Sequence, residues 1–251
     1  MDREHFYSTM NGAGNLDYEV YLNTSKLLSC QKGFADFCNA DELQFMVVHQ
    51  SMELWMKLVG YTLLDVDDFI RSRNANRVLT LMDRVKRILL IMTDTIGVLE
   101  TMSPHDYQDI RVQLGNGSGQ ESPGFRTLLQ MYQPLWESYK AVYLDGDGRT
   151  VQDVYHTGYR HDDAYMVAEA LVEYDELFHK FRYHHIQLIH RSIGIHSMSL
   201  KGRSVDLLEH GLRTQFFPEL WAIRAQMTDE WGQEYGKVRS PIGHGEGGGG
   251  E

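Results

Sequence analysis

Cysteine, proline and long apolar runs are all scarce in this sequence. Only two cysteines, Cys30 and Cys38, occur in 251 residues, so we expect no disulfide framework and a reducing compartment. No stretch approaches the roughly 18 consecutive apolar residues of a membrane span. The N-terminus also lacks the basic-then-apolar pattern of a secretory signal. These absences favour a cytoplasmic protein without a membrane-spanning segment.

Positive charge is also in short supply. The chain has 24 Lys and Arg against 35 Asp and Glu, which gives a formal net charge of −11. An acidic surface argues against nucleic acid and anionic membranes as main partners. It says little about a small zwitterionic ligand, which responds mainly to its own pocket. No G-x-S-x-G, Walker A or Rossmann fingerprint occurs, so these motifs indicate neither a hydrolase nor a nucleotide-binding protein.

The sequence does contain long stretches without proline or glycine, in which apolar residues recur at three- and four-residue spacing. This periodicity predicts helices, while the period-two alternation of strands is scarcely visible. Asp41 is a candidate N-cap for the first long helix. The prediction is an all-α fold of long helices, with helices at about 41–71, 75–102, 104–114, 124–141, 162–193, 204–213 and 217–234.

Residues 1–236 are expected to form a single domain, followed by a Gly-rich tail at 237–251 that reads as disordered. Two stretches interrupt the helical pattern, at 115–124 and 194–204. Loops carry function on rigid scaffolds, so either stretch is a candidate lid or binding loop, or else a plain connection. The plain connection is the better interpretation of each loop taken alone.

Two pairs of side chains share faces of predicted helices. Phe45 and His49 are four residues apart on a face that is otherwise apolar. This pattern indicates either a polar group beside the aromatic wall of a cavity or a core histidine with one hydrogen bond. Tyr107 and Arg111 are also four apart, and a planar guanidinium beside a phenol suits a carboxylate. The alternative for this second pair is a solvated face with nearby aspartates.

Four histidines occur in HKFRYHHIQLIHRSIG, residues 179–194. Phe181, His185, Leu188 and Ile189 fall on one helix face, so His185 lies on an apolar stripe. A neutral imidazole in such a place suits an axial ligand of a haem iron. For each of these residues considered alone, an ordinary structural role is the better interpretation.

Five segments, taken in chain order, resemble the tryptophan 2,3-dioxygenase family from about Leu16 to about Arg224. Each segment is moderately specific, and all five in the family's order are strongly specific. The resemblance therefore outweighs the structural interpretations of single residues. The segments are LDYEVYLNTSKLLSCQ, FMVVHQSMELWMK, VLETMSPHDYQDIRVQLGNGSG, FRYHHIQLIHRSIG and RTQFFPELWAIR.

The resemblance implies a bundle of long helices that holds a b-type haem and assembles as a homotetramer. His185 would be the axial iron ligand, and His49 would be the distal histidine near the indole N–H. Phe45 would line the indole pocket. Arg111 would hold the substrate carboxylate, with Tyr107 beside it.

The resemblance also implies contributions from two further segments. In the family an N-terminal segment reaches into the site of a neighbouring subunit, and Tyr18, Tyr21 and Leu22 match that segment. The stretch 115–119, GNGSG, matches a glycine-containing loop next to the amino-acid end of the substrate. The implied partners are therefore L-tryptophan or a substituted tryptophan, O2 and further copies of this chain.

One departure from the family pattern follows His185. The family carries a Gly-Thr-Gly-Gly-Ser type loop whose threonine helps to hold the substrate ammonium. Here Ser199 stands where the threonine should be, while Leu200 and Lys201 replace glycines. Glycines adopt backbone conformations that Leu and Lys resist, so we expect this loop to close differently.

Two reaction outcomes stay open on the sequence. The family implies insertion of both oxygen atoms at C2 and C3 of the indole. The altered loop leaves a monooxygenase as the alternative, giving a 2-oxindole from a tryptophan analogue with an external reductant. Two alternatives without catalysis also stay open. A haem-binding sensor would need no Arg111–Tyr107 pair, so the presence of this pair counts against it. A purely helical interaction protein would bind no haem and would be colourless when purified.

Overall fold

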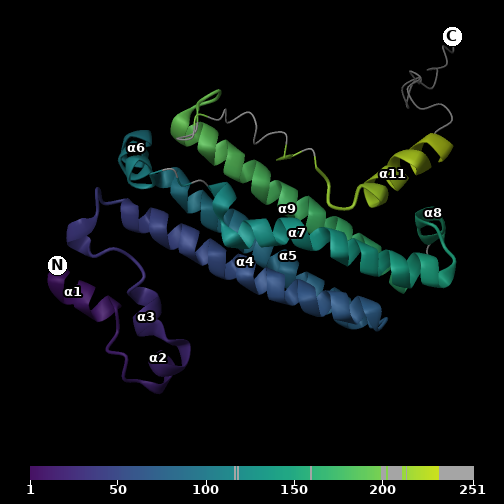
Figure 1. The fold of residues 1–251 in the computed structure, drawn as a ribbon, viewed down its shortest axis with the longest axis horizontal. Helices are drawn as coiled ribbons and strands as arrows, with labels where there is room; N and C mark the ends of the chain where they lie inside the picture. The colour runs from purple at the N-terminus through teal and green to yellow at the C-terminus, as the bar shows by residue number, and fades with distance from the viewer. Residues whose placement is uncertain are drawn as a thin grey trace, which may run out of the picture.

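The computed structural model describes residues 1–115, 117, 119–158, 160–198, 202, 211–212 and 214–231 (Figure 1). Every regular element within these ranges is a helix, which confirms the all-α prediction. No helix in the described part combines the length and apolar character needed to cross a bilayer. The α-helices are α1 (Arg3–Met10), α2 (Asp17–Leu22), α3 (Thr24–Leu28), α4 (Glu42–Arg71), α5 (Ala75–Gly97), α6 (Pro104–Gln113), α7 (Pro123–Tyr139), α8 (Val151–Tyr155), α9 (Asp163–Ile193) and α11 (Pro218–Trp231).

Helices α4, α5, α7 and α9 form a bundle (Figure 1). Helix α5 packs against both α4 and α9, and α4 packs against α7. The bundle closes where α7 meets α9: the rings of Phe125 and Phe178 lie 5.7 Å apart, and the Tyr139 hydroxyl donates to the Ala164 carbonyl at 3.0 Å. Apolar residues at helical spacing on all four helices are buried in this core. Their burial is the main source of its stability.

Most predicted helices are present, with changes at their ends. The predicted helix 75–102 ends its α-helical part at Gly97 and continues as the 3-10 turn η2 (Val98–Thr101). Asp41 precedes α4, but its side chain makes no capping hydrogen bond, so that proposed cap is wrong. Of the helix predicted at 204–213, only residues 211 and 212 lie within the described part. The short helices α1, α2, α3 and α8 were not predicted.

Side-chain caps mark the beginnings of several helices, among them α6, α7 and α9. Ser103, Ser122 and Asp162 each accept a hydrogen bond from a backbone N–H in the first turn of α6, α7 and α9, respectively. Proline follows Ser103 and Ser122 at the first helical position, where its missing N–H costs nothing. Two of these helices, α6 and α9, contribute residues to the pocket described below.

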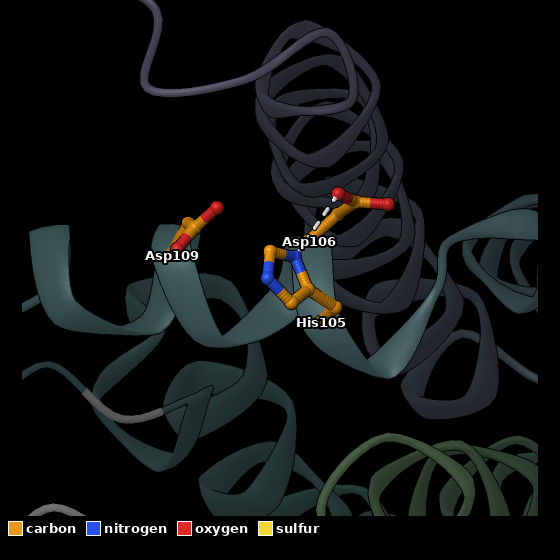
Figure 2. A group of neighbouring side chains, drawn as sticks. All are labelled: His105, Asp106 and Asp109. Atoms are coloured by element: carbon orange, nitrogen blue, oxygen red, sulfur yellow. Dashed lines mark ion pairs between the residues drawn. The ribbon is translucent and has the colours of Figure 1, made fainter.

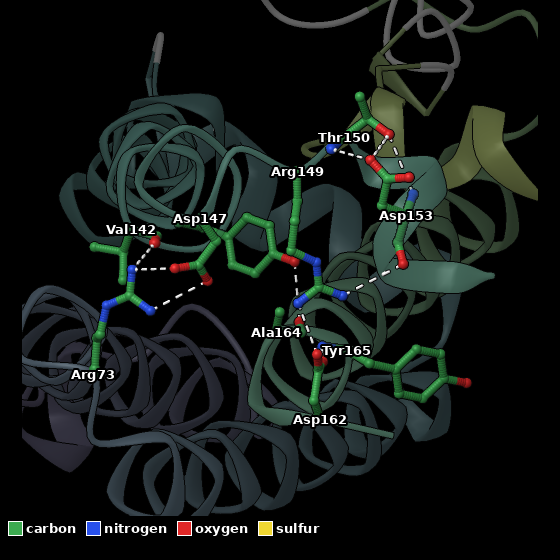
Figure 3. Close-up of polar contacts among 10 residues, drawn as sticks. Arg73, Val142, Asp147, Arg149, Thr150, Asp153, Asp162, Ala164 and Tyr165 are labelled. Atoms are coloured by element: carbon green, nitrogen blue, oxygen red, sulfur yellow. Dashed lines mark hydrogen bonds and ion pairs between the residues drawn. The ribbon is translucent and has the colours of Figure 1, made fainter. Parts of the chain in front are cut away.

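Ion pairs tie together the connection between α7 and α9 (Figure 3). Arg73, just beyond α4, pairs with Asp147 at 2.8 Å and also donates to the Val142 carbonyl. Arg149 pairs with Asp162 at 2.7 Å, next to the start of α9. This network lies at the end of α4 and the beginning of α9, so it braces the end of the bundle opposite to the pocket described below.

A fully buried carboxylate attaches α11 to the bundle. Oδ2 of Asp175, on α9, accepts from the backbone N–H of Phe216 (2.9 Å) and of Phe217 (3.2 Å) and from the indole N–H of Trp221 (2.8 Å). Its other oxygen lies 3.2 Å from Nε2 of His179. Buried polar groups are stable only when they are paired in this way. Asp175 therefore fixes the segment that leads into α11.

We predict that Asp175→Asn lowers the free energy of unfolding by about 2–4 kcal/mol. The amide keeps one oxygen for the three N–H donors, but it loses the negative charge that strengthens each of these hydrogen bonds. Urea unfolding followed by circular dichroism measures the effect. Asp65→Asn removes an exposed carboxylate from α4 and serves as the control. Equal unfolding midpoints for the two variants would contradict the role given to Asp175.

Candidate active site

The beginning of α4, the end of α9 and helix α6 lie at the same end of the bundle (Figure 1), and residues of all three line a pocket. It brings together four residues that the sequence analysis selected from three distant segments: Phe45, His49, Tyr107 and His185. Its volume is about 50 Å³. The remaining lining residues are Leu99, Met102, Leu188, Ile189 and Ser192.

His49 enters the pocket from α4 beside Phe45, with the two ring centroids 4.1 Å apart. Its Nδ1 lies 2.8 Å from the Phe45 carbonyl oxygen. Because a carbonyl can only accept, Nδ1 carries the proton. Burial lowers the pKa of His49 below its usual 6.5, so the ring is neutral near pH 7. The bare Nε2 can then accept a hydrogen bond within the pocket.

His185 enters from α9, and its ring lies near that of Phe181, with centroids 6.4 Å apart. Burial lowers the pKa of His185 to about 4, and the neighbouring His49 and His184 also disfavour its cation. The imidazole is therefore neutral at physiological pH. A neutral imidazole has the free lone pair that a metal ion requires. His185 thus has the protonation state of an axial ligand.

Helix α6 contributes Tyr107 to the pocket and carries Arg111 one turn further on. The Tyr107 ring lies 6.2 Å from that of Phe45, and burial raises the pKa of its phenol. Arg111 is not among the lining residues. Its Nη2 donates to the carbonyl of Met198 at 2.6 Å, so the guanidinium is tied to the segment that follows α9. The structure therefore places Arg111 beside Tyr107 but outside the wall of the pocket.

The described residues among the other predicted site positions lie outside this pocket. Tyr18, Tyr21 and Leu22 lie on α2 with 71%, 88% and 45% of their surfaces exposed, and none of them lines the pocket of its own chain. Ser199 lies outside the described residues, together with the Leu and Lys that follow it. Whether these residues contact substrate stays a prediction.

Several apolar residues that line the pocket were not identified from the sequence. Leu99 and Met102 come from the η2 turn and the residue after it, where the helical periodicity ends. Leu188 and Ile189 had been grouped with His185 on one face but had no assigned role. Ser192 lies seven residues, or two turns, after His185 on the same helix, and that spacing is the signal that would have found it.

A second group of potential ligands lies on the outside of α6 (Figure 2). Donor atoms of His105, Asp106 and Asp109 lie within 4.8 Å of one another. The His105 side chain is 87% exposed, and Asp106 already accepts from the hydroxyl of Ser103 at the start of the helix. Exposed acidic groups often cluster without a metal, and we assign no site here.

The chemistry of the main pocket fits a haem. It offers one neutral imidazole as a ligand, a second imidazole near it and otherwise mainly apolar or aromatic walls. A volume of about 50 Å³ is smaller than a porphyrin, so binding requires the walls to move apart. Fold and donor set together define the class: an all-α protein with a histidine pocket suited to a b-type haem.

The chain belongs to the tryptophan 2,3-dioxygenase family, because the family model of that description matches residues 3–133, just over half of the chain. Proteins named tryptophan 2,3-dioxygenase align over most of its length. That of Erythrobacter litoralis is 28% identical over 84% of this chain and 98% of its own. That of Caulobacter vibrioides is 29% identical over 86% and 100%, respectively. This family consists of haem-dependent oxidoreductases, and we assign the chain to that enzyme class.

The low pKa of His185 predicts a pH dependence of stability in the haem-free protein. Its pKa is about 4 in the folded chain and 6.5 in the unfolded chain, so between these values the unfolded chain binds more protons. The stabilisation is therefore present above pH 6.5 and is lost as the pH falls from 6.5 to 4. The loss is at most about 3 kcal/mol, and less because the side chain keeps some solvent exposure.

His185→Gln should remove most of this dependence, because glutamine does not titrate. Urea unfolding of the haem-free protein at several pH values between 4 and 7 measures it. His105→Gln changes an exposed histidine on α6 and serves as the control. A slope in His185→Gln as steep as in the parent protein would show that another group is responsible.

Proposed function

We propose that this chain uses a b-type haem to insert oxygen from O2 into the indole ring, at C2 and C3, of L-tryptophan or a substituted tryptophan. The observation that carries this proposal is the meeting of His49, His185, Phe45 and Tyr107 in one pocket beside Arg111. Membership of the tryptophan 2,3-dioxygenase family supports it. Residues 1–236 would form the catalytic domain, in a cytoplasmic protein.

His185 would hold the haem iron through a ring nitrogen. The haem, when bound, supplies the activation of dioxygen, and the protein supplies binding, orientation and electrostatics. Burial keeps the ligand neutral and available, and apolar residues around it limit its contact with water. A dry, apolar setting also strengthens every electrostatic interaction inside the pocket.

His49 would orient the indole. Its Nδ1–H is used by the Phe45 carbonyl, so its Nε2 can accept a hydrogen bond from the indole N–H. One such contact fixes the rotation of the ring in its plane, and the Phe45 ring offers an apolar face against which the indole can pack. Correct placement of the reacting carbons can account for a large part of the rate acceleration over the uncatalysed reaction.

Arg111 and Tyr107 would bind the carboxylate of the substrate. A guanidinium presents two parallel N–H donors that match a carboxylate. In the structure one of these donors is bonded to the Met198 carbonyl, so the substrate would share or replace that partner. The pair also separates this function from that of a haem-binding sensor, which needs no group for a carboxylate.

The enzyme would act as a homo-oligomer, with a tetramer as the expected form. The observation in support is the exposure of Tyr18, Tyr21 and Leu22 on α2, away from the pocket of their own chain. Exposed apolar groups of this kind are typical of surfaces that another chain covers. In the assembly this helix would complete the pocket of a neighbouring copy.

Single-oxygen insertion is the second candidate. It rests on Leu200 and Lys201, which replace glycines next to Ser199 in the loop that should close over the substrate. A less complete closure would admit water or a reductant before the second oxygen is transferred. The product would then be a 2-oxindole, and the second oxygen atom would leave as water with two electrons from an external donor.

We predict that Arg111→Leu weakens substrate binding at least tenfold, because a charge-assisted contact contributes about 1.5–3 kcal/mol. Haem content should match that of the parent protein. Titration with tryptophan, followed by the change in the haem absorption spectrum, measures the affinity. Arg87→Leu, an exposed arginine on α5, is the control. Equal affinities of parent and Arg111→Leu would exclude the carboxylate role.

Product mass tests the proposed function directly. The reduced protein is incubated with O2 and either tryptophan or a ring-methylated tryptophan, with and without an added reductant. Two added oxygen atoms without reductant are expected for the dioxygenase. One added oxygen with strict dependence on reductant would instead establish the monooxygenase. Failure to oxidise either indole under both conditions would overturn the substrate assignment.

A further inference from the structure

A carboxylate on α4 holds the start of α7. Glu53 lies one helical turn after His49, and one of its oxygens accepts from the Ser122 hydroxyl. The other oxygen accepts from the backbone N–H of Gly124 at 3.0 Å. The Ser122 hydroxyl oxygen in turn accepts from the backbone N–H of Phe125 at 3.0 Å. Two α4-to-α7 hydrogen bonds thus meet on a single side chain.

Gly124 shows how closely the two helices approach there. A Cβ atom at this position would lie 2.7 Å from the Cβ of Met56 and 2.8 Å from Oε2 of Glu53. Real contacts of this kind are essentially never so short, so only glycine fits without a shift of α7. The negative charge of Glu53 also lies next to the N-terminus of a helix, where an anion is stabilised. This arrangement holds the beginning of α7 against α4.

The hydrogen bonds of Glu53 to Ser122 and Gly124 anchor the start of α7. The turn that immediately precedes this anchor lies next to His185, the candidate iron ligand. A Cβ atom on Gly119, at the start of the turn η3 (Gly119–Glu121), would lie 3.4 Å from Cε1 and 4.0 Å from Nε2 of His185. The backbone of Gly119 therefore lies beside the imidazole. Only two residues separate it from Ser122, so a shift at the anchor passes directly to the contact with His185.

We propose that Glu53 is a positioning residue: through Ser122 and Gly124 it sets where the turn η3 lies beside His185. Glu53 does not line the pocket, and beyond the effect of its charge on His49 it reaches the site through the turn. Its place on α4 matters, because the same helix carries His49. One rigid helix thereby positions the distal histidine directly and the backbone beside the axial ligand indirectly. The expected effect of Glu53 on haem binding rests on the proposed function, whereas its expected effect on the position of the turn η3 does not.

A merely structural staple between α4 and α7 would have different consequences. Its loss would lower the stability of the whole bundle and would increase exchange at amides throughout it. Loss of a positioning residue would act mainly on the turn and on the contact with His185. The spectrum and affinity of the bound haem report on the environment of its ligand, and global stability can be measured separately.

The test compares Glu53→Leu, Ser122→Ala and Glu53→Gln in the full-length protein as purified. Leucine removes both acceptors, and alanine removes the hydroxyl. Glutamine retains the bridge, because its oxygen can accept from Gly124 while its amide donates to Ser122. Asp65→Asn, which removes an exposed carboxylate from the same helix, is the matched control. The measurements are hydrogen exchange by mass spectrometry, haem affinity and absorption maximum, and urea unfolding.

Glu53→Leu and Ser122→Ala should increase exchange selectively in the segment Gly119–Phe125. They should weaken haem binding by about tenfold, the factor expected for loss of a charge-assisted hydrogen bond, and shift the absorption maximum. Glu53→Gln should remain within about threefold of the parent, on the smaller loss expected when a neutral hydrogen bond replaces a charged one. Parent-like exchange and haem binding in Glu53→Leu would overturn the proposal. Uniformly increased exchange throughout the bundle would also overturn it, in favour of the structural staple.

If the parent protein binds no haem, the proposed function fails. The hydrogen-exchange measurement still decides whether Glu53 holds the turn η3 in place.

Discussion

The apolar packing of α5 between α4 and α9 is the interaction on which the pocket depends. Buried residues of α5 recur at three- and four-residue spacing and contact both neighbours. Truncation of one such residue typically costs about 2–5 kcal/mol. Because α4 carries His49 and α9 carries His185, this packing sets how far apart the two imidazoles lie. Neither histidine is placed by a loop, so the backbone positions of both are fixed by the packed helices of the core.

The same burial that stabilises the bundle determines the chemistry of these histidines. An imidazole removed from water loses its proton more readily, and both pKa values are lowered in this way. A protonated ring could neither bind iron nor accept from an indole N–H. A mutation that opened the pocket to water would therefore restore ordinary pKa values and weaken both proposed roles together, even with each histidine still present.

The helices were predictable because their periodic apolar stripes are long. Their ends were less so: the cap predicted at Asp41 is absent, and the helix from Ala75 tightens into η2 at Val98, where Leu99 then joins the pocket. Phe45, His49, Tyr107 and His185 were identified only through the order of family segments, since each has an ordinary structural interpretation alone. The pairing of Glu53 with Ser122 joins residues 69 positions apart. No local pattern signals such a contact.

Arg111 links the proposed binding of the substrate carboxylate to the segment that follows α9. Its guanidinium donates to the carbonyl of Met198, the residue directly before Ser199 and the substituted glycines. A neutral carbonyl accepts a hydrogen bond with a net value of about 0.5–1.5 kcal/mol, whereas a carboxylate contributes about 1.5–3 kcal/mol. Under the proposed function the substrate carboxylate is therefore the stronger partner for Arg111.

A bound substrate must then either share the guanidinium with Met198 or release the backbone at that point. Both possibilities couple occupancy of the pocket to the conformation of the segment after α9. Leu200 and Lys201 lie two and three residues beyond Met198 in the sequence, outside the described part of the chain. Under the proposed function the departure from the family sequence would therefore bear on how the pocket closes around substrate, while the two histidines depend on the helices of the bundle.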